Sequence, residues 1–532
     1  MTALSYRPAD TGRPVLENTC GGVLRDAAAA APDTVALAEF VPPGETGRQW
    51  TYAALLRDAE RAAAWLLERF SSGERVAVWS PNLPEWVLLQ YGAGLAGIVL
   101  VTANPALREA ELAHLLRQSG AAGVVYLESF RGTDMAAVVD RIAPGLPALR
   151  ERVGFTGWYD GLGDTPLRPL PEVAPGSAAQ IQYTSGTTGA PKGAVLHHRG
   201  LVTNADFVAA RVGFPEGGVW VSALPLFHTA GCGLTVLGAA QRRGTLVLPP
   251  FYEPGLILSA MRHWRADTFG GVPAMLGGLL AHPEFDSYDL SACERIMSGG
   301  DSVPAPMVTE AERRFGARFS TVYGQTELSP IVAQTSPDDT IADKTTTTGQ
   351  PLWQAEMKVI DPASGDIVPA GVPGEICARG YQVMLGYHEQ PDATAAAVDG
   401  DGWLHTGDLG TMDERGYLTV TGRLKDMIIR GGENIYPAEI ETALLRHPAV
   451  RAAVVLGVPD DGWGEQVAAV VTPADPERPP TAAELHEYLR AGLAPHKTPR
   501  HWYLAEAVPA NAMGKIQKFL LRDRLADLPR LP

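Results

Sequence analysis

Apolar runs alternate with helical patterns through the N-terminal part of the chain. Short runs rich in Val, Ala and Leu predict buried strands at residues 75–80, 98–102 and 123–126. Between them, apolar residues at helical spacing predict helices over residues 84–97 and 108–119. Strands that alternate with helices in this way are typical of a parallel α/β sheet.

The alternation resumes after residues 155–177, a stretch rich in Pro and Gly that we interpret as a connector. Beyond it, the apolar runs predict strands at residues 178–182, 219–223, 245–248 and 268–270. Helical spacing predicts helices over residues 231–242 and 254–265 here, and another over residues 52–70, before the first strand. A second set of α/β layers is therefore expected in this part of the chain.

From about residue 340 the pattern changes to short strands and turns, which predicts a β-rich subdomain over residues 340–423. Its strands are expected at residues 356–360, 374–380 and 417–421. Residues 424–532 predict a small α+β domain, with strands at 452–456 and 467–471 and helices over 438–447, 481–492 and 517–525. The expected fold is α/β, with a large N-terminal domain (residues 1–423) of layered α/β subdomains and a small C-terminal domain.

Composition and charge are those of an ordinary globular protein with more than one core. The chain has 532 residues, of which 45% are apolar and 20% charged. Its 44 basic and 60 acidic residues give a net charge of −16, which argues against a nucleic-acid-binding surface. Anionic ligands must therefore be met by local cations. The absence of any apolar run of about 18 residues argues against a membrane span.

The cysteines and the N-terminus bear on location. Cys20, Cys232, Cys293 and Cys377 form no CxxC pair, so neither a zinc site nor a disulfide framework is indicated. The first residues lack the charged head and apolar core of a signal peptide. Both features favour a reducing, cytoplasmic location.

One stretch concentrates the residue types that bind phosphate, and it reads Tyr183-Thr-Ser-Gly-Thr-Thr-Gly-Ala-Pro-Lys-Gly-Ala194. Its glycines let successive backbone amides turn toward one point, and its small hydroxyls and Lys192 add donors, so it can cradle a polyphosphate. It does not match the Walker P-loop, because Lys192 follows Pro191 and precedes Gly193. Taken alone, an ordinary Gly/Ser/Thr surface loop stays open as the alternative.

Five further stretches place polar side chains in apolar or Gly-rich surroundings. In chain order they are residues 224–233, 297–304, 321–330, 402–408 together with 422–437, and 509–518. With the phosphate-loop stretch, they resemble in order and spacing the core motifs of the adenylate-forming superfamily, which includes the acyl-CoA synthetases. The resemblance runs from about residue 178 to residue 520, and the N-terminal third is compatible with it.

The resemblance implies a reaction in two halves. A carboxylate attacks the α-phosphate of ATP to give acyl-AMP and pyrophosphate, and a thiol, usually that of coenzyme A, then displaces AMP. Two anions must be brought together, charge must be neutralised at phosphorus, and the activated acyl group must be kept from water. The implied cofactors are ATP and Mg²⁺, with CoA as co-substrate.

Several motif residues would bind the nucleotide. By the resemblance, Tyr323 stacks on adenine, Glu327 holds Mg²⁺, a hard ion that prefers carboxylate oxygen, and Asp408 accepts the ribose hydroxyls. Taken singly, Tyr323 could equally be a core aromatic, Glu327 a solvated charge, Asp408 a helix cap and Arg423 a surface ion pair. The Tyr-Gly-x-Thr-Glu unit as a whole favours the site. The implied nucleotide-binding residues are Thr184, Ser185, Gly186, Thr187, Thr188, Lys192, Gly300, Asp301, Ser302, Tyr323, Gly324, Thr326, Asp408, Arg423 and Lys515.

Lys515 is the implied main catalytic group of the first half-reaction, where it would bridge carboxylate and α-phosphate oxygens. The family more often shows Pro-x-Thr-Gly-Lys, whereas this chain has Asn-Ala-Met-Gly-Lys and keeps the Gly-Lys pair. Lys518, one helical turn later, is the competing candidate. Thr326, Glu327 and His228 complete the implied catalytic set, with His228 as a gate for the incoming thiol. A lone histidine near a strand end is also often a satisfied core side chain.

The second half-reaction would use a different arrangement of the chain. Lys425 occupies the hinge position of the family, about which the small C-terminal domain is mobile and rotates. The rotation would bring Gly431 and Gly432 to the CoA tunnel, where the absence of side chains lets the pantetheine arm pass close to the backbone.

The implied acyl pocket contains no Lys, Arg, Asp or Glu. Its candidate residues are Trp220, His228, Thr229, Gly231, Cys232, Gly233, Gly271, Val272, Met275, Gly299, Gln325 and Ser329. An amino acid would need a buried carboxylate for its ammonium, and a dicarboxylate would need a buried cation. We therefore expect a monocarboxylic acid with an uncharged body, either medium-chain or aromatic.

Three function classes remain open at this stage. The first is an acid–CoA ligase. The second is an adenylating enzyme whose acceptor is a carrier-protein thiol, an amine or nitrite. The third, a nucleotide-binding sensor without activity, is disfavoured because Lys515, Glu327 and Asp408 are all retained. We expect small-molecule partners and neither nucleic acid nor membrane, and the sequence leaves a homodimer or a separate carrier protein open.

Overall fold

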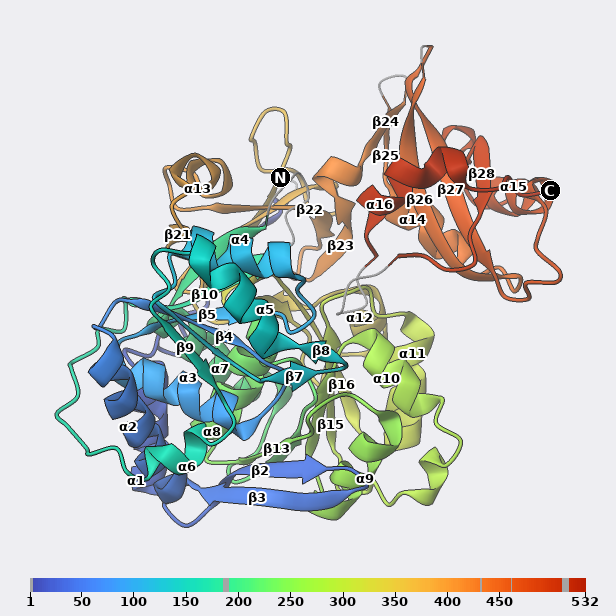
Figure 1. Ribbon diagram of the computed structural model, residues 1–532. Coiled ribbons are helices and arrows are strands. Elements are labelled where there is room, and N and C mark those ends of the chain that lie inside the picture. Colours follow the sequence, from blue (N-terminus) through green and yellow to red (C-terminus); the bar gives the residue numbers. More distant parts are fainter. Residues whose placement is uncertain (1–2, 185–190, 431–432, 461, 510–515) are drawn as a thin grey trace. The chain divides into compact units, whose positions relative to one another are not determined.

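The computed structural model describes residues 3–184, 191–430, 433–460, 462–509 and 516–532 (Figure 1). The chain forms two compact units. The larger consists of Arg7–Met357 and Ala378–His405, and the smaller consists of Met1–Tyr6, Lys358–Cys377 and Thr406–Pro532. The expected fold class is confirmed, because the structure is a mixed α/β protein with a large N-terminal and a small C-terminal part. The domain boundary and hinge at Lys425 stay a prediction.

A seven-stranded sheet forms one layer of the larger unit, in the order β21-β11-β10-β5-β4-β6-β9. The five strands from β10 to β9 are parallel, and β11 and β21 add antiparallel to the edge. Val101, Val124 and Met135 belong to the apolar core on one face of this sheet. The strands and the helices near them are β4 (Arg75–Trp79), β5 (Val99–Ala103), β6 (Gly123–Tyr126), β9 (Glu151–Gly154), β10 (Ala178–Thr184), β11 (Lys192–His197), β21 (Gly386–Tyr387), α3 (Pro84–Ala96), α4 (Glu109–Ser119) and α5 (Met135–Ile142).

A nine-stranded sheet forms the second layer, in the order β18-β17-β16-β15-β14-β12-β13-β2-β3. Its central strands are parallel, and antiparallel strands close both edges. Helices α9, α10 and α11 pack on one face over a core that includes Phe269, Ile296 and Phe319 (Figure 1). The elements are β2 (Val35–Val41), β3 (Glu45–Thr51), β12 (Val219–Val221), β13 (Thr245–Leu248), β14 (Thr268–Gly271), β15 (Arg295–Gly299), β16 (Arg318–Gly324), β17 (Ile331–Gln334), β18 (Gln350–Pro351), α9 (Pro254–Trp264), α10 (Pro273–Leu280) and α11 (Ala305–Phe315).

A further group of helices packs together with α3 in the larger unit, namely α1 (Cys20–Ala30), α2 (Tyr52–Arg69), α7 (His198–Val212) and α8 (Gly238–Gln241). The helix predicted over residues 231–242 is present, but its first part, Ala230–Leu237, is a π-helix. The predicted connector, residues 155–177, carries a short helix, α6 (Trp158–Leu162), which is a correction. Two of its three large side chains, Trp158 and Leu162, are buried, and this burial explains why the segment folds.

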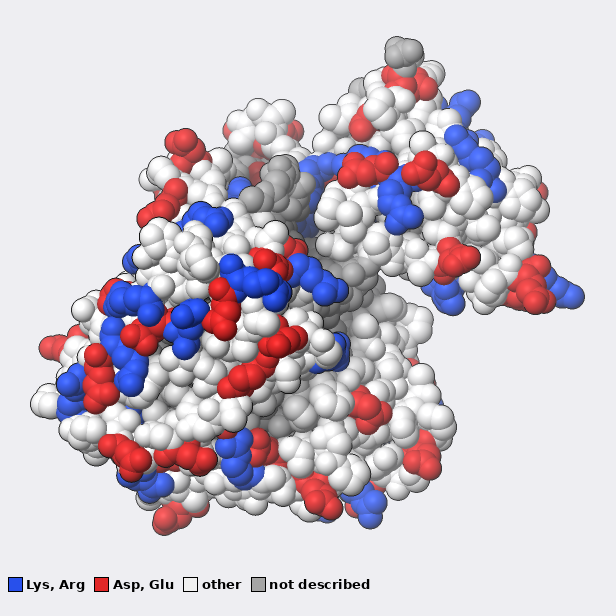
Figure 2. All heavy atoms as spheres, viewed as in Figure 1, with Lys and Arg blue, Asp and Glu red and all other residues white. Residues whose placement is uncertain are grey.

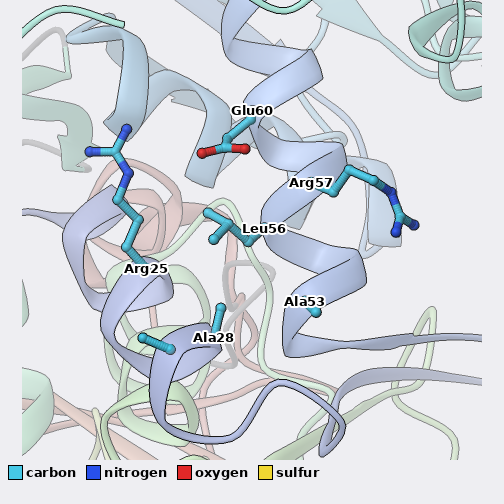
Figure 3. Close-up of a pocket in the computed structure, with 7 residues that line it drawn as sticks. Arg25, Ala28, Ala53, Leu56, Arg57 and Glu60 are labelled. Carbon is cyan, nitrogen blue, oxygen red and sulfur yellow. The ribbon is translucent and has the colours of Figure 1, made fainter.

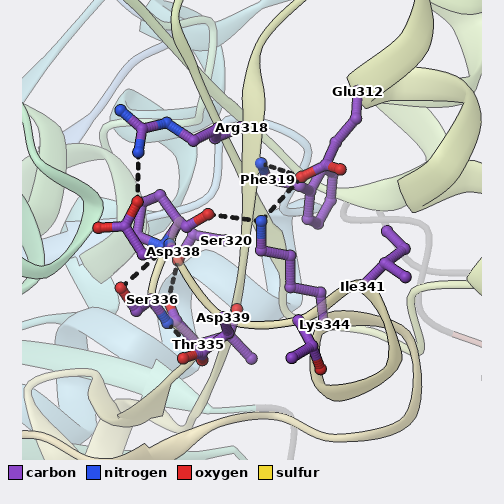
Figure 4. Close-up of polar contacts among 12 residues, drawn as sticks. Glu312, Arg318, Phe319, Ser320, Thr335, Ser336, Asp338, Asp339, Ile341 and Lys344 are labelled. Atoms are coloured by element: carbon purple, nitrogen blue, oxygen red, sulfur yellow. Dashed lines mark hydrogen bonds and ion pairs between the residues drawn. The ribbon is translucent and has the colours of Figure 1, made fainter.

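A buried lysine joins three elements beside the end of β16 (Figure 4). Lys344 lies in α12 (Ile341–Thr346), and its Nζ lies 2.9 Å from Glu312 Oε1 of α11. The same ammonium donates to the carbonyl of Pro337, and the Lys344 carbonyl accepts from the hydroxyl of Thr321 on β16. The lysine charge is thus satisfied inside the fold and is used for structure.

The smaller unit contains the sheet β25-β24-β27-β26, with β28 parallel to β27. Its strands and helices are β24 (Ile428–Arg430), β25 (Glu433–Ile435), β26 (Val450–Asp460), β27 (Gly464–Pro473), β28 (His501–Leu504), α14 (Pro437–Leu444), α15 (Ala482–Arg490) and α16 (Lys518–Arg524). Val455 and Val454 of β26 face two apolar clusters, one on each face of the sheet. The predicted α+β character of this part is confirmed.

Strands are also found where the β-rich subdomain is predicted. They are β19 (Ala355–Ile360), β20 (Gly374–Gly380), β22 (Leu404–Met412) and β23 (Leu418–Arg423). The chain passes between the two units within β19, β20 and β22. A short helix, α13 (Pro391–Ala397), lies between β20 and β22 in sequence.

Surface charge is mixed on the face shown in Figure 2, where Lys and Arg alternate with Asp and Glu over short distances. Among the helices of the described residues, none is both long enough and apolar enough to cross a bilayer.

Candidate active site

Three parallel strands of the nine-stranded sheet end side by side. Gly271 of β14 pairs with Ser298 of β15, and Gly299 of β15 pairs with Val322 of β16. The segments that leave these strands therefore start at one edge of the sheet. In open α/β sheets, ligands bind outside the carboxyl ends of the strands. The structure brings two of the sequence motifs, residues 297–304 and 321–330, to this edge, beside the predicted pocket residues Gly271 and Val272.

The segment after β15 turns sharply outward. Gly300 has a φ of +81°, a left-handed conformation that favours glycine. Asp301 and Ser302 follow it at the surface, and the Ser302 N–H donates to Asp301 Oδ1 at 2.7 Å. These three residues, which are among those predicted to bind the nucleotide, are thus exposed at the sheet edge.

The end of β16 is held by a close approach to β17. A Cβ on Gly324 would lie 1.9 Å from the carbonyl oxygen of Pro330, so only glycine fits there. Tyr323, just before it, is 9% exposed. Thr326 then begins a 3₁₀ turn that ends at Leu328, and Glu327 within the turn is 8% exposed. Glu327 is therefore not the solvated surface charge of the alternative interpretation.

A hydrogen bond fixes the side chain of Glu327. The hydroxyl of Tyr387, on β21, donates to Glu327 Oε1 at 2.7 Å. The ring of Tyr387 also lies below Lys192, whose Nζ is 5.0 Å from the ring centroid. Burial and the neighbouring carboxylate raise the pKa of Tyr387 well above its usual range, so the phenol remains a donor.

The phosphate-loop stretch is framed by two paired strands. Thr184, the last residue of β10, pairs with Lys192, the first residue of β11, and its hydroxyl donates to the Lys192 carbonyl at 3.4 Å. The framing strands place Lys192 at the mouth of the loop. The predicted phosphate contacts Ser185, Gly186, Thr187 and Thr188 lie outside the described residues.

His228 lies in a tight turn after β12. Its Nδ1 accepts from the N–H of Ala230 at 3.2 Å, and its carbonyl accepts from Gly231 and Cys232 at the start of the π-helix. The ring is partly exposed, in contrast to the core histidine of the alternative interpretation. Its gating role stays a prediction.

The positions predicted to form the acyl pocket are mostly buried. Trp220, Thr229 and Cys232 are each fully buried. The indole Nε1 of Trp220 and the hydroxyl of Thr229 have no hydrogen-bond partner among the described residues. The Cys232 thiol lies 3.2 Å from Gln182 Nε2, and burial raises its pKa to about 12, so it is not a nucleophile at neutral pH. The remaining predicted positions that are buried are Gly231, Gly233, Gly271, Val272, Gly299 and Ser329, while Met275 and Gln325 are half-buried.

Asp408 and Arg423 belong to the smaller unit, where they lie opposite each other on β22 and β23. Arg423 Nε is 2.9 Å from Asp408 Oδ1, and the Asp408 side chain is only 5% exposed. Asp408 lies within a strand and is therefore not a helix cap. Arg423 is thus in an ion pair, as in its alternative interpretation, although its partner Asp408 is buried, and the ribose contacts of both residues stay a prediction.

The lysines of the smaller unit differ in their environments. Lys518 Nζ lies 2.7 Å from Glu441 Oε1 and also donates to the carbonyl of Val455. This places Lys518 in a structural ion pair, which argues against it as the catalytic lysine. Lys425 lies in a 3₁₀ turn, Leu424–Asp426. Lys515, Gly431 and Gly432 lie outside the described residues.

A separate surface groove of about 320 Å³ lies between α1 and α2 (Figure 3). It is lined by Arg25, Arg57 and Glu60 with small apolar side chains. None of the predicted site residues that the structure describes lines this groove. We therefore do not assign the reaction to this groove.

The donor set around Glu327 fits a hard divalent cation. Glu327 offers a buried carboxylate whose Oε1 is held by the Tyr387 hydroxyl, while Oε2 takes no part in that bond. Mg²⁺ prefers such carboxylate oxygens and is usually bound by one or two of them together with substrate phosphates.

Tyr387 is a site residue that sequence reasoning missed. It lies 60 residues after Glu327 in a two-residue strand, too short to give a periodic signal. Its place became visible only through the pairing of β21 with β11. The only sign of Tyr387 in the sequence is that it follows Gly386 at the end of a short apolar stretch.

Comparison with known proteins gives two family matches. Residues 24–388 match the family described as AMP-binding enzyme, and residues 439–515 match the AMP-binding enzyme C-terminal domain. Together the two matches span most of the chain.

Individual relatives agree with this result. A feruloyl-CoA synthase of an Amycolatopsis species is 38% identical over 90% of this chain and 94% of its own length. The mitochondrial medium-chain acyl-CoA ligase ACSF2 of Macaca fascicularis is 33% identical over 98% of this chain and 89% of its own length. The crystal structure of ATP-bound MatB from Rhodopseudomonas palustris superimposes with a TM-score of 0.86 at 29% identity, covering 96% of this chain and 99% of that chain.

Proposed function

Because the chain belongs to the family of AMP-binding enzymes, we propose that it joins a monocarboxylic acid with an uncharged body to coenzyme A. In the first step a carboxylate oxygen of the acid attacks the α-phosphorus of ATP, and pyrophosphate leaves. In the second step the CoA thiol attacks the acyl carbonyl, and AMP leaves with the electron pair of the broken bond. Relatives named as CoA synthases and ligases support ATP-dependent acid–CoA ligation and do not favour a different acceptor.

The observation that carries the acid class is the lack of charge at the predicted pocket positions. Trp220, Thr229 and Cys232 are fully buried and uncharged, as are the glycines around them. A buried ammonium or second carboxylate on the acid would meet no opposite charge there, and burial of an unpaired charge is very costly. The names of the two relatives, a feruloyl-CoA synthase and a medium-chain ligase, cover the aromatic and the aliphatic form of such an acid.

We assign roles to the chain's own residues as part of this proposal. Lys192, with the loop that it closes, binds the β- and γ-phosphates, while Tyr323 stacks on adenine. Glu327 holds Mg²⁺, which neutralises phosphate charge when it is bound. Asp408, held by Arg423, accepts the ribose hydroxyls.

Catalysis in this proposal depends on two further parts of the chain. Lys515 approaches the α-phosphate during the first step, where its compact ammonium stabilises the developing negative charge. Gly431 and Gly432 admit the pantetheine arm in the second step, and His228 controls its access to the acyl group. Rotation about Lys425 exchanges the two arrangements.

Free thiols bear on the proposed location. Cys20, Cys232 and Cys293 form no disulfide and are buried. We propose a reducing, cytoplasmic location on this basis. CoA serves as the thiol in the proposed reaction, which therefore needs no carrier protein.

The test is product analysis with a panel of acids. The enzyme is incubated with ATP, Mg²⁺ and octanoate-, benzoate- or cinnamate-type acids, with and without CoA, alongside malonate and free amino acids. We expect pyrophosphate with every accepted acid and, when CoA is present, conversion of acyl-AMP to acyl-CoA detected by mass. Acyl-AMP that persists unchanged after CoA addition contradicts the ligase, and preference for malonate or amino acids contradicts the uncharged pocket.

A further inference from the structure

Tyr387 contacts two groups that come from different parts of the larger unit. Its hydroxyl donates to Glu327 Oε1 at 2.7 Å, and Lys192 Nζ lies 5.0 Å from the centroid of its ring. Lys192 opens strand β11, and Glu327 lies in the turn after β16. One side chain therefore links the phosphate-loop lysine to the proposed metal-binding carboxylate.

The two contacts use different parts of the tyrosine. The hydroxyl gives a hydrogen bond to an ionised carboxylate, which is shorter and stronger than a bond between neutral groups. The face of the ring attracts the lysine ammonium through its quadrupole. Removal of the hydroxyl alone should therefore release Glu327 and leave the contact with Lys192 intact.

The backbone around Tyr387 is fixed on both sides. Its N–H donates to the hydroxyl of Thr394 at 2.9 Å, and the N–H of His388 donates to the carbonyl of Gly193 at 2.8 Å. The N–H of Met384 donates to the Glu327 carbonyl at 2.9 Å. The segment that carries Tyr387 is thus tied to the backbone of both partners, so its side chain is held in register with them.

Tyr387 also contributes to the surface of the larger unit. Tyr387 lines an open surface groove of about 440 Å³ together with Val195, Leu385, His388 and Glu389. The tyrosine is therefore partly buried against its partners without being sealed in the core.

We propose that Tyr387 is a positioning residue that holds Glu327 and Lys192 at the spacing needed to bind a divalent cation with the nucleotide. The inference rests on the proposed function, because the roles of Glu327 and Lys192 come from it. Outer residues that orient a metal-binding carboxylate typically contribute 10- to 100-fold to metal affinity or activity. Tyr387 does not itself contact substrate in this assignment.

The test uses two variants of the full chain. Tyr387→Phe keeps the ring and removes the hydroxyl, and Tyr387→Leu removes both contacts. Binding of Mn²⁺ is measured by electron paramagnetic resonance in the presence of α,β-methylene-ATP, which cannot be cleaved at the reacting bond. We expect Tyr387→Phe to weaken Mn²⁺ binding by about tenfold, with the affinity for the metal-free nucleotide nearly unchanged. Tyr387→Leu should weaken both.

A matched control separates positioning from general damage. Tyr52 is also buried, and its hydroxyl donates to the Gly244 carbonyl at 2.6 Å, far in sequence from both partners of Tyr387. Tyr52→Phe should leave Mn²⁺ binding unchanged. In turnover, Tyr387→Phe should raise the Mg²⁺ concentration needed for half-maximal pyrophosphate release, while the KM for the acid stays within about twofold of the wild type.

Two results would overturn the inference. One is wild-type Mn²⁺ affinity in Tyr387→Phe, and the other is an equal loss of Mn²⁺ affinity in Tyr52→Phe. Because the binding measurement needs no turnover, it remains decisive even when the wild-type enzyme forms no acyl-CoA. A wild-type enzyme that forms no acyl-CoA would count against the proposed function alone. If Tyr387→Leu does not fold, Tyr387→Phe still decides.

Discussion

At the scale of single residues, the buried imidazole of His198 makes the fold sensitive to acid. His198 is 1% exposed, and its Nδ1 accepts from the N–H of Cys20 at 3.3 Å. Desolvation lowers its pKa from 6.5 to about 4, with a smaller contribution from His197. The folded chain therefore binds this proton more weakly than the unfolded chain, so protonation favours unfolding.

The sign of the pH dependence follows from that shift. The stability that depends on neutral His198 is complete above about pH 6.5 and is lost as the pH falls toward 4. The variant His198→Asn keeps an acceptor for the N–H of Cys20 and cannot be protonated. Between pH 6.5 and pH 4 we expect it to lose less stability than the wild type, and the difference should reach roughly 3 kcal/mol at most. Denaturant unfolding at several pH values checks this. Substitution of the exposed His486 by Asn is the control, and equal slopes in wild type and His198→Asn would refute the prediction.

The roles of residues were predictable where side chains of different chemistry, such as an aromatic ring, a hydroxyl and a carboxylate, lie close together in sequence. Tyr323, Thr326 and Glu327 occur within five residues, so the chemistry of the unit is visible without a structure. Asp408 and Arg423 belong to one stretch of the sequence pattern, but their ion pair at 2.9 Å could not be predicted from it, because it depends on the pairing of β22 with β23. Partners such as Tyr387 were not predictable, because they reach the site only through strand pairing between distant segments.

At the scale of elements, Lys344 ties a short helix to its neighbours. Its side chain is 5% exposed and lies 2.9 Å from Glu312, with a second bond to the Pro337 carbonyl. We expect Lys344→Met to lower the free energy of unfolding by about 3 kcal/mol, because it leaves Glu312 without its cation. Chemical denaturation checks this. The double variant with Glu312→Gln should recover part of the loss, since no unpaired charge remains.

An exposed ion pair of the same chain provides the comparison. Lys497 lies 2.7 Å from Glu439, and both side chains are partly exposed, at 24% and 39%. Surface pairs contribute little, so Lys497→Met should cost less than about 1 kcal/mol. If the two single variants lost the same stability, burial would not explain the role of Lys344.

The alternation of strands and helices was predictable because buried strands are short, apolar and bounded by turns. The strands at Arg75–Trp79 and Gly123–Tyr126 lie where the sequence predicts them. The type of helix was not predictable, because the apolar pattern of Ala230–Leu237 does not distinguish an α-helix from a π-helix. Helix α6 was not predictable because only three large side chains mark it in a segment rich in prolines and glycines.

At the scale of the whole molecule, distant segments share one compact unit. The N–H of Ser5 donates to the carbonyl of Val368 at 2.8 Å, although more than 360 residues separate them. Such contacts are invisible to periodicity, which reports only local structure. Sequence reasoning therefore recovered the order of the parts and their fold class, whereas the assignment of the first residues to the smaller unit required the structure.

We propose that the two half-reactions use different residues of the C-terminal part of the chain, and a substitution of Lys515 tests this. We expect Lys515→Ala to slow acyl-AMP formation by more than about a hundredfold, because a positive charge is lost where negative charge develops. Thiolysis of supplied acyl-AMP should be largely intact. Rapid-quench measurement of each half-reaction checks this, with Lys518→Ala as the neighbouring control, since Lys518 is bound to Glu441. Equal loss of both half-reactions in Lys515→Ala would contradict the assignment.

Lys425 offers the complementary test. A proline at this position fixes φ near −65° and removes the backbone N–H, so the turn Leu424–Asp426 can no longer change conformation freely. We expect Lys425→Pro to keep acyl-AMP formation and to lose most thioester formation, the reverse of Lys515→Ala. Single-turnover assays with ATP and with purified acyl-AMP separate the two steps. Opposite losses in the two variants require two arrangements of one site, whereas normal thioester formation in Lys425→Pro would remove Lys425 as the hinge.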